Sequence, residues 1–149
     1  MRPDAPSDPN LSTIDVNGLP LTYMDYGTGP TVVAIHGLPG DGTDFRWLGP
    51  VLEPHTRFIR LNLPGFGESS CQLGTLVWPD PVRFVADALE RLDVSDGILL
   101  RHSYGTLIAL HASLNASERL RGVALLAPIG LRPHRGFRRY PSAKFGAAA

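Results

Sequence analysis

The chain has 149 residues, and its 14 lysine and arginine residues balance 14 aspartate and glutamate residues, so the formal net charge is zero. This length is enough for one domain with a sizeable core, and no apolar run approaches the roughly 18 residues that a membrane span needs. The single cysteine, Cys71, excludes an internal disulfide, and we interpret it as a spare thiol in a loop.

Two strands are predicted over residues 14–26, joined by the turn pair Asn17-Gly18. A buried strand follows over residues 31–36, and Phe45, Leu48 and Leu52 recur at helical spacing in a predicted helix over residues 44–52. The next predicted strand covers residues 58–62. This first half of the chain therefore combines a hairpin with a strand–helix–strand unit.

The clearest helix begins after Asp80, which can cap it, with Pro81 at the first helical position. Its apolar face ends near Leu92, and a strand over residues 97–101, a helix after Ser103 and a last buried strand over residues 123–127 complete the order. This alternation predicts an α/β fold: a doubly wound, mostly parallel sheet with an N-terminal antiparallel hairpin.

The two ends of the chain differ from its middle. We predict a flexible lead-in over residues 1–12, with no signal peptide, a domain over residues 13–130, and a basic tail over residues 131–149. No acidic residue follows Glu118. One interpretation of the tail is binding to an anionic surface; we favour a connecting segment, and expect a cytoplasmic protein that binds neither nucleic acid nor membrane.

Three motifs follow three of the predicted strands: HGLPG at residues 36–40, NLPGFGES at residues 62–69 and RHSYG at residues 101–105. The carboxyl ends of parallel strands share one edge of a sheet, where ligands bind in such folds. Taken alone, a serine before a helix is equally an N-cap. In this order, within about 75 residues, the motifs resemble the α/β-hydrolase family in its serine-nucleophile branch.

The resemblance covers roughly residues 14–135 and implies a truncated α/β-hydrolase fold. It makes Ser103 the nucleophile and assigns the oxyanion hole to the backbone N–H groups of Leu38 and Tyr104. The side chain or backbone of four further residues would support these loops: His36, Gly37, Gly40 and Gly105. We expect a small ester, amide or related acyl substrate, an acyl-serine intermediate, and neither a metal nor a cofactor.

A serine at this position speaks against the epoxide-hydrolase and haloalkane-dehalogenase branches, which the resemblance associates with a carboxylate nucleophile. The family's triad order is Ser, then an acid, then His, but only Glu118, His111 and His134 follow Ser103 with suitable side chains. We expect the acid and base, and the cap over the site, to lie outside this chain. A non-catalytic binding or regulatory protein is the alternative.

Two residues of the RHSYG motif need separate interpretation. His102 is predicted to be structural, because adjacent side chains on a strand point to opposite faces. Arg101 stands where the family has glycine, and an unpaired buried charge costs several kcal/mol. We therefore predict that Arg101→Gly stabilises the protein. Asn62, where relatives often carry Asp, is predicted to hold the turn that follows it, with Glu68 and Ser69 stabilising the same loop.

Overall fold

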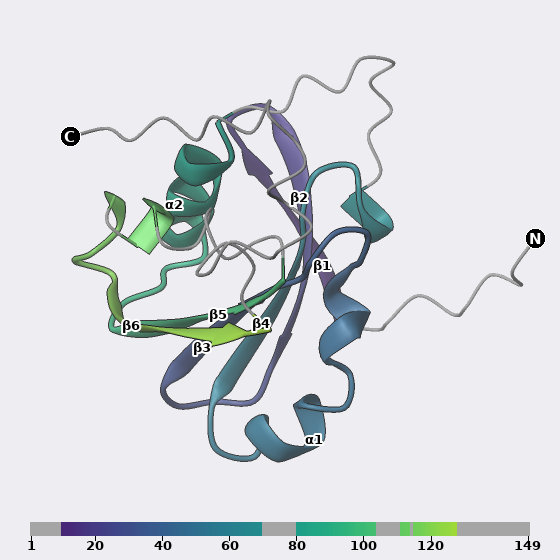
Figure 1. Ribbon diagram of the computed structural model, residues 1–149, viewed down its shortest axis with the longest axis vertical. Helices are drawn as coiled ribbons and strands as arrows, with labels where there is room; N and C mark the ends of the chain where they lie inside the picture. The colour runs from purple at the N-terminus through teal and green to yellow at the C-terminus, as the bar shows by residue number, and fades with distance from the viewer. Residues whose placement is uncertain (1–9, 70–79, 104–110, 114, 128–149) are drawn as a thin grey trace, which may run out of the picture.

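The computed structural model describes residues 10–69, 80–103, 111–113 and 115–127. These residues form one six-stranded sheet with helices on its two sides (Figure 1). In chain order the elements are β1 (Leu11–Val16), β2 (Leu19–Tyr26), β3 (Thr31–Ile35), the 3₁₀ helix η1 (Gly42–Phe45), α1 (Gly49–Leu52), β4 (Arg57–Asn62), the 3₁₀ helix η2 (Gly67–Ser69), α2 (Pro81–Arg91), β5 (Gly97–His102) and β6 (Leu120–Leu126).

The strand order across the sheet is β1-β2-β4-β3-β5-β6. The first two neighbouring pairs, β1/β2 and β2/β4, are antiparallel, whereas β4/β3, β3/β5 and β5/β6 are parallel. The predicted fold class is therefore confirmed. The last strand begins at Leu120, three residues before the predicted start, and ends at Leu126.

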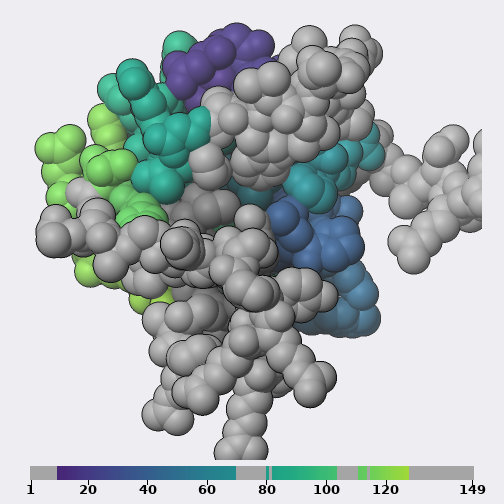
Figure 2. All heavy atoms as spheres, turned by 45° about the horizontal axis from the view of Figure 1, so that its top comes forward, coloured from purple at the N-terminus to yellow at the C-terminus, as the bar shows by residue number. Residues whose placement is uncertain are grey.

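The N-terminal hairpin forms at the predicted turn. Asn17 and Gly18 both have positive φ angles, of 55° and 82°, as a tight two-residue hairpin turn requires. Asn17 donates a hydrogen bond to the carboxylate of Asp87 at 2.5 Å. Asp87 belongs to α2, so the tip of the hairpin lies against that helix, as the neighbouring purple and teal surfaces in Figure 2 show.

Apolar side chains fill both faces of the sheet, because successive strand residues point to opposite faces. On the α2 side the buried cluster includes Val33, Ile35, Ile59, Leu61 and Leu99 from the strands, with Phe84, Val85, Ala88 and Leu89 from the helix. On the α1 side it includes Val32, Ala34, Phe58 and Leu100, against which Phe45, Leu48 and Leu52 pack.

The predicted helix over residues 44–52 is wrong as a single element. The segment forms a 3₁₀ turn, Gly42–Phe45, and then the one-turn helix α1, Gly49–Leu52. Pro50 explains the break, because proline has no N–H to donate to a preceding turn and disfavours helical geometry in the residue before it. Pro50 instead lies in the first turn of the new helix, where a missing N–H costs nothing.

The helix predicted after Asp80 is confirmed. The side chain of Asp80 accepts hydrogen bonds from the N–H groups of Val82, at 2.9 Å, and Arg83, at 3.4 Å. For the helix predicted after Ser103, residues 104–110 and 114 lie outside the described residues. Residues 111–113 and 115 are helical, and Ala112 lies in the core on the α2 side.

Candidate active site

The three motifs meet at one edge of the sheet. β4, β3 and β5 are neighbours and parallel, so their carboxyl ends, and the motifs that follow them, lie side by side. The register pairs Ile35 with Arg101, which brings the HGLPG loop alongside the end of β5. Segments about 65 residues apart in the sequence are thereby placed around one position.

Ser103 has a strained backbone at the end of β5. Its φ angle is 55°, in the left-handed region that residues with a Cβ rarely adopt. Its N–H donates to the carbonyl of Leu126 at 3.0 Å, so the pairing with β6 holds the backbone immediately before the bend. The side chain is half-buried. Strain of this kind costs about 1–3 kcal/mol and concentrates at functional sites.

Gly37 lies so close to Ser103 that a side chain at position 37 would force its neighbours to shift. A Cβ atom there would lie 3.0 Å from the Cβ of Ser103 and 3.2 Å from Nδ1 of His102. Gly40 is similarly restricted, because its Cβ would collide with the carboxylate of Asp44. The glycines of the HGLPG loop therefore allow close contacts within the protein.

His36 joins the loops after β3 and β4. Its Nε2 accepts a hydrogen bond from the N–H of Leu63 at 3.1 Å, so the proton of the neutral ring is on Nδ1, which donates to the carbonyl of Gly37 at 2.7 Å. The ring is 1% exposed and meets Phe66 edge to face. Burial lowers the pKa of His36 below its usual 6.5, which favours the neutral form that both bonds need. These two hydrogen bonds place His36 where it can support the loops after β3 and β4.

A buried polar network fixes the loop after β4. Oδ1 of Asn62 accepts from the N–H of Gly42 at 2.7 Å, and its Nδ2 donates to the hydroxyl of Thr22 at 2.9 Å. The hydroxyl of Ser69 donates to the carbonyl of Asn62 and accepts from the N–H of Thr22, both at 2.7 Å. Asn62 thus holds the turn after β3, not the turn that follows it. Glu68 is exposed.

A family model described as the alpha/beta hydrolase fold matches residues 30–144. The chain belongs to this family. It is 30% identical over 119 residues to a haloalkane dehalogenase of Mesorhizobium japonicum, covering 79% of this chain and 38% of the relative. It is 32% identical over 118 residues to the dihydrolipoyllysine-residue acetyltransferase component of the acetoin cleaving system of Cupriavidus necator, covering 78% of this chain and 31% of the relative.

The solved structures include the haloalkane dehalogenase DatA from Agrobacterium tumefaciens C58, with a TM-score of 0.71 and 24% identity, over 79% of this chain and 40% of that structure. At this identity the likeness concerns the fold. The chain spans between 31% and 40% of the length of these relatives. No helix among the described residues has the length and apolar character needed to cross a bilayer.

Position 101 is arginine, whereas the nucleophile motif of alpha/beta hydrolases has glycine there. Its side chain is 0% exposed, and none of its three guanidinium nitrogens has a hydrogen-bond partner among the described residues. Burial lowers its pKa to about 9, well below the ordinary value of a guanidinium. The described part of the chain thus gives this guanidinium neither a route to water nor a buried partner.

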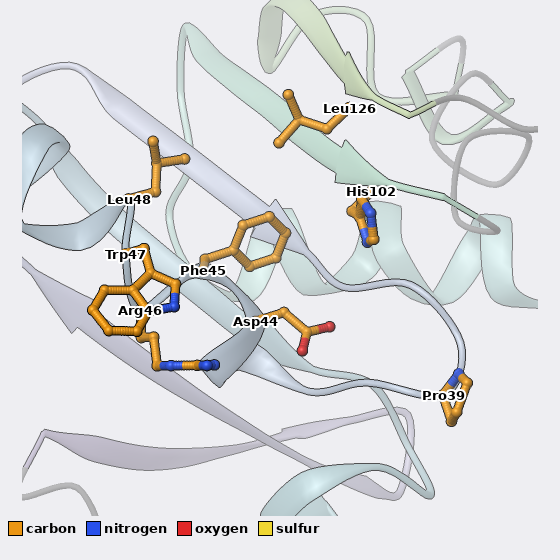
Figure 3. Close-up of a pocket in the computed structure, with 8 residues that line it drawn as sticks. All are labelled: Pro39, Asp44, Phe45, Arg46, Trp47, Leu48, His102 and Leu126. Carbon is orange, nitrogen blue, oxygen red and sulfur yellow. The ribbon is translucent and has the colours of Figure 1, made fainter.

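A pocket of about 590 Å³ lies beside the end of β5 on the α1 side (Figure 3). His102 and Leu126 line it from the ends of β5 and β6, and Asp44 lines it from η1. Figure 3 shows the carboxylate of Asp44 directed toward the side of the pocket on which His102 lies. The remaining lining residues are Pro39, Phe45, Arg46, Trp47 and Leu48.

The other predicted residues fall in different places. Leu38, a predicted oxyanion-hole donor, is 38% exposed in the loop beside Ser103, while Tyr104 and Gly105 lie outside the described residues, as do Cys71 and His134. Glu118 lies in the turn before β6, at the opposite edge of the sheet from Ser103, and His111 is exposed. Within the described residues no three His, Cys, Asp or Glu side chains are grouped as metal ligands.

Two residues that shape this edge, Asp41 and Thr22, were not among those predicted from the sequence. Asp41 caps η1 by accepting from the N–H of Thr43 at 2.7 Å, a bond that the pattern Asp-x-Thr could have indicated. Thr22 joins β2 to the loop after β4. No local pattern marks Thr22, because its partners are 40 and 47 residues away.

Proposed function

We propose that this alpha/beta hydrolase chain carries a serine nucleophile, Ser103, and acts on a small ester, amide or related acyl substrate through an acyl-serine intermediate. The observation that carries the proposal is the left-handed backbone of Ser103 at the end of β5, packed against Gly37. A sharp strand-to-helix turn of this kind presents a serine hydroxyl to substrate.

The oxyanion that forms during attack needs preorganised donors. Under the proposal these are the backbone N–H groups of Leu38 and Tyr104. Support comes from the position of the HGLPG loop, which His36 and Gly37 hold beside Ser103. Loss of one such donor typically lowers turnover by about 100- to 1000-fold.

The residue at the turn separates this chain from the relatives named haloalkane dehalogenases. The resemblance associates that branch with a carboxylate nucleophile, whereas position 103 is serine. A serine hydroxyl attacks a carbonyl only with a base to take its proton. Acyl transfer, with the serine ester as intermediate, is therefore the reaction that this side chain supports best.

The second part of the proposal is that the family's triad acid and late histidine are not among these 149 residues. Glu118 is the only acidic residue after Ser103 in the sequence, and it lies at the opposite edge of the sheet. The chain also covers 38% of the dehalogenase relative. An in-frame nucleotide continuation that encodes an Asp and a later His supports this part; a continuation without them contradicts it.

The test of the nucleophile is labelling with a fluorophosphonate, applied to the product of an in-frame continuation that supplies an acid and a base. We expect an adduct on Ser103, located by mass spectrometry, that Ser103→Ala abolishes. Ser117→Ala is the matched control, because Ser117 is an exposed serine in the turn before β6. A folded product of that continuation without an adduct at Ser103 would contradict the proposal.

A non-catalytic binding or regulatory protein is the second candidate, favoured by the buried guanidinium of Arg101 two residues before Ser103. A charge at this position opposes the close packing that the turn needs. This candidate predicts that Ser103 resists the fluorophosphonate in a folded protein. It also predicts that Ser103→Ala leaves any ligand affinity unchanged.

A further inference from the structure

The outer side of β6 is a free strand edge within the part of the chain that the structure describes. β6 is the last strand in the order across the sheet, and β5 is its one neighbour there (Figure 1). The N–H of Ser103 donates to the carbonyl of Leu126 at 3.0 Å, so the backbone of Leu126 faces β5. Because the N–H and C=O groups of successive strand residues point to alternate sides, Val123 and Leu125 present theirs to the outer side. Such a row of groups is a template for another strand.

The devices that commonly protect a strand edge are missing from most of β6. Proline and charged side chains are the usual ones, but the strand sequence, LRGVALL, has no proline and one charged residue, Arg121. The guanidinium of Arg121 lies 3.4 Å from the carboxylate of Asp96 in its own chain. The stretch 122–126 therefore carries no charge that opposes the approach of another strand.

The residues that face outward from β6 fit a second copy of the same strand laid antiparallel to it. When Val123 of one copy lies opposite Leu125 of the other, each residue exchanges both backbone hydrogen bonds with its mate. A two-fold axis repeats this pair, so all four outward-facing residues are satisfied. Both side chains are half-buried in the single chain. On the α2 side of the sheet, the second copy therefore pairs apolar side chains with apolar side chains.

The opposite face of β6 is complementary to itself in the same register. Gly122, Ala124 and Leu126 share the α1 side, because alternate strand residues point to one face. Leu126 is 42% exposed, and a Cβ atom on Gly122 would meet no atom within 4 Å. In the antiparallel pair, Leu126 of each copy lies opposite Gly122 of the other, and the two Ala124 residues meet at the axis. An exposed apolar side chain thus lies over open space, twice.

We propose that the outer edge of β6 binds a second copy of this chain, in a symmetric antiparallel pair of strands centred on Ala124. In this register Arg121 lies opposite Ala127, so no like charges are opposed, and the formal net charge of zero adds no long-range repulsion. The proposal goes beyond the hydrolase function and does not depend on the role of Ser103. Strand pairing alone makes a small interface, so we expect a dimer that dissociates on dilution.

The first test is sedimentation equilibrium of the purified 149-residue chain, because a longer product would offer the edge a covalently linked competitor. A reducing agent is present so that Cys71 cannot join two copies. We expect a reversible monomer–dimer equilibrium between about 1 and 200 µM, the range of weak interfaces. A chain that stays monomeric over this range would overturn the proposal. Open-ended aggregation would also overturn it, since a two-fold pair is closed.

The second test locates the register by oxidative cross-linking in a Cys71→Ser background. The two Ala124 residues form a non-hydrogen-bonded pair with Cα atoms about 4.5 Å apart, within the range of about 4.4–6.8 Å that a disulfide spans. Val123→Cys is the matched control, because its two copies lie diagonally, about 7–8 Å apart. We expect Ala124→Cys to give a disulfide-linked dimer at least ten times faster than Val123→Cys. Equal cross-linking of the two variants would refute this register.

A swap of side chains tests the contact on the α1 side. Gly122→Leu meets no neighbour in the single chain but collides with Leu126 of the second copy, so we expect association to weaken at least tenfold. Adding Leu126→Ala removes the collision and should restore the dimer. A folded double variant that associates no better than Gly122→Leu would contradict the predicted contact.

A change of the backbone tests the strand pairing itself. Leu125→Pro removes an outward N–H that β5 does not use, and proline is tolerated at such an edge position. Leu125→Ala is the control, because it shortens the same side chain and keeps the N–H. With cooperative melting curves for both variants, we expect Leu125→Ala to dimerise at least tenfold more tightly than Leu125→Pro. Equal association of the two variants would show that the edge hydrogen bonds are not used and would overturn the proposal.

Discussion

Replacing Arg101 by methionine should stabilise the protein substantially. Burial lowers the guanidinium pKa to about 9, which means that the folded state holds this charge at a cost of several kcal/mol. Methionine removes the charge and fills a similar volume with an unbranched apolar side chain. We expect a gain of about 3–5 kcal/mol in the free energy of unfolding, since part of the arginine stem already contributes buried apolar surface.

The measurement is urea and thermal unfolding followed by circular dichroism at pH 7.5. For a domain of this size the gain corresponds to a rise of about 10 °C in melting temperature. Arg91→Met, at an exposed arginine of α2, is the control and should change stability by less than about 0.5 kcal/mol. Arg101→Gly should gain less than Arg101→Met, because glycine leaves a cavity and loosens the strand.

The pH dependence gives an independent check of the cause. Below pH 9 the guanidinium is charged in both the folded and the unfolded chain, so the full penalty is present. Above pH 9 the folded chain releases a proton that the unfolded chain keeps, so the stability of the wild type rises relative to Arg101→Met. The difference between the two proteins should shrink by about 1.5 kcal/mol between pH 9 and 10.5.

Either of two results would refute this reasoning. A lower melting temperature for Arg101→Met would mean that the guanidinium is stabilised in the folded protein. A stability difference that stays constant from pH 8 to 10.5 would mean that the charge is not held at a cost, whatever the sign of the difference.

Two further substitutions test the geometry of the site. Gly37→Ala places a methyl group 3.0 Å from the Cβ of Ser103, so we expect fluorophosphonate labelling to slow by at least tenfold with a stability loss of about 1–2 kcal/mol; unchanged labelling would show that the turn adapts. Asn62→Leu removes the amide oxygen that accepts from Gly42 and the amide nitrogen that donates to Thr22. The buried N–H of Gly42 is then left without an acceptor. The substitution should cost about 2–4 kcal/mol in urea unfolding, whereas Asn62→Asp, which keeps an acceptor oxygen, should cost less.

Much of the fold follows from local patterns. The pair Asn17-Gly18 determines the hairpin because both positions adopt positive φ. Asp80 defines the start of α2 because a side-chain acceptor there satisfies the first free N–H groups. Apolar runs bounded by glycine and proline located the parallel strands. In each of these cases the pattern spans only a few residues, so the element can be predicted from the sequence alone.

The failures share a different cause. The segment over residues 44–52 kept its helical spacing of apolar side chains, but Pro50 ended one turn and began another. The burial of Arg101 and the bonds of Thr22 depend on how distant strands align. Local motifs therefore indicate where the candidate site lies in the sequence. The packing of distant segments determines which side chains lie together in it.

The neutral imidazole of His36 makes the architecture of this edge sensitive to acid. Its Nε2 can accept the N–H of Leu63 only while unprotonated, and its lowered pKa keeps it so in the folded state. Below about pH 6.5 the unfolded chain gains a proton that the folded chain resists, so stability declines as the medium becomes more acidic. Once the ring is protonated, the hydrogen bond that joins the loops after β3 and β4 is lost. Acidification would then loosen the two loops that lie beside Ser103. This effect is separate from the protonation of any catalytic group.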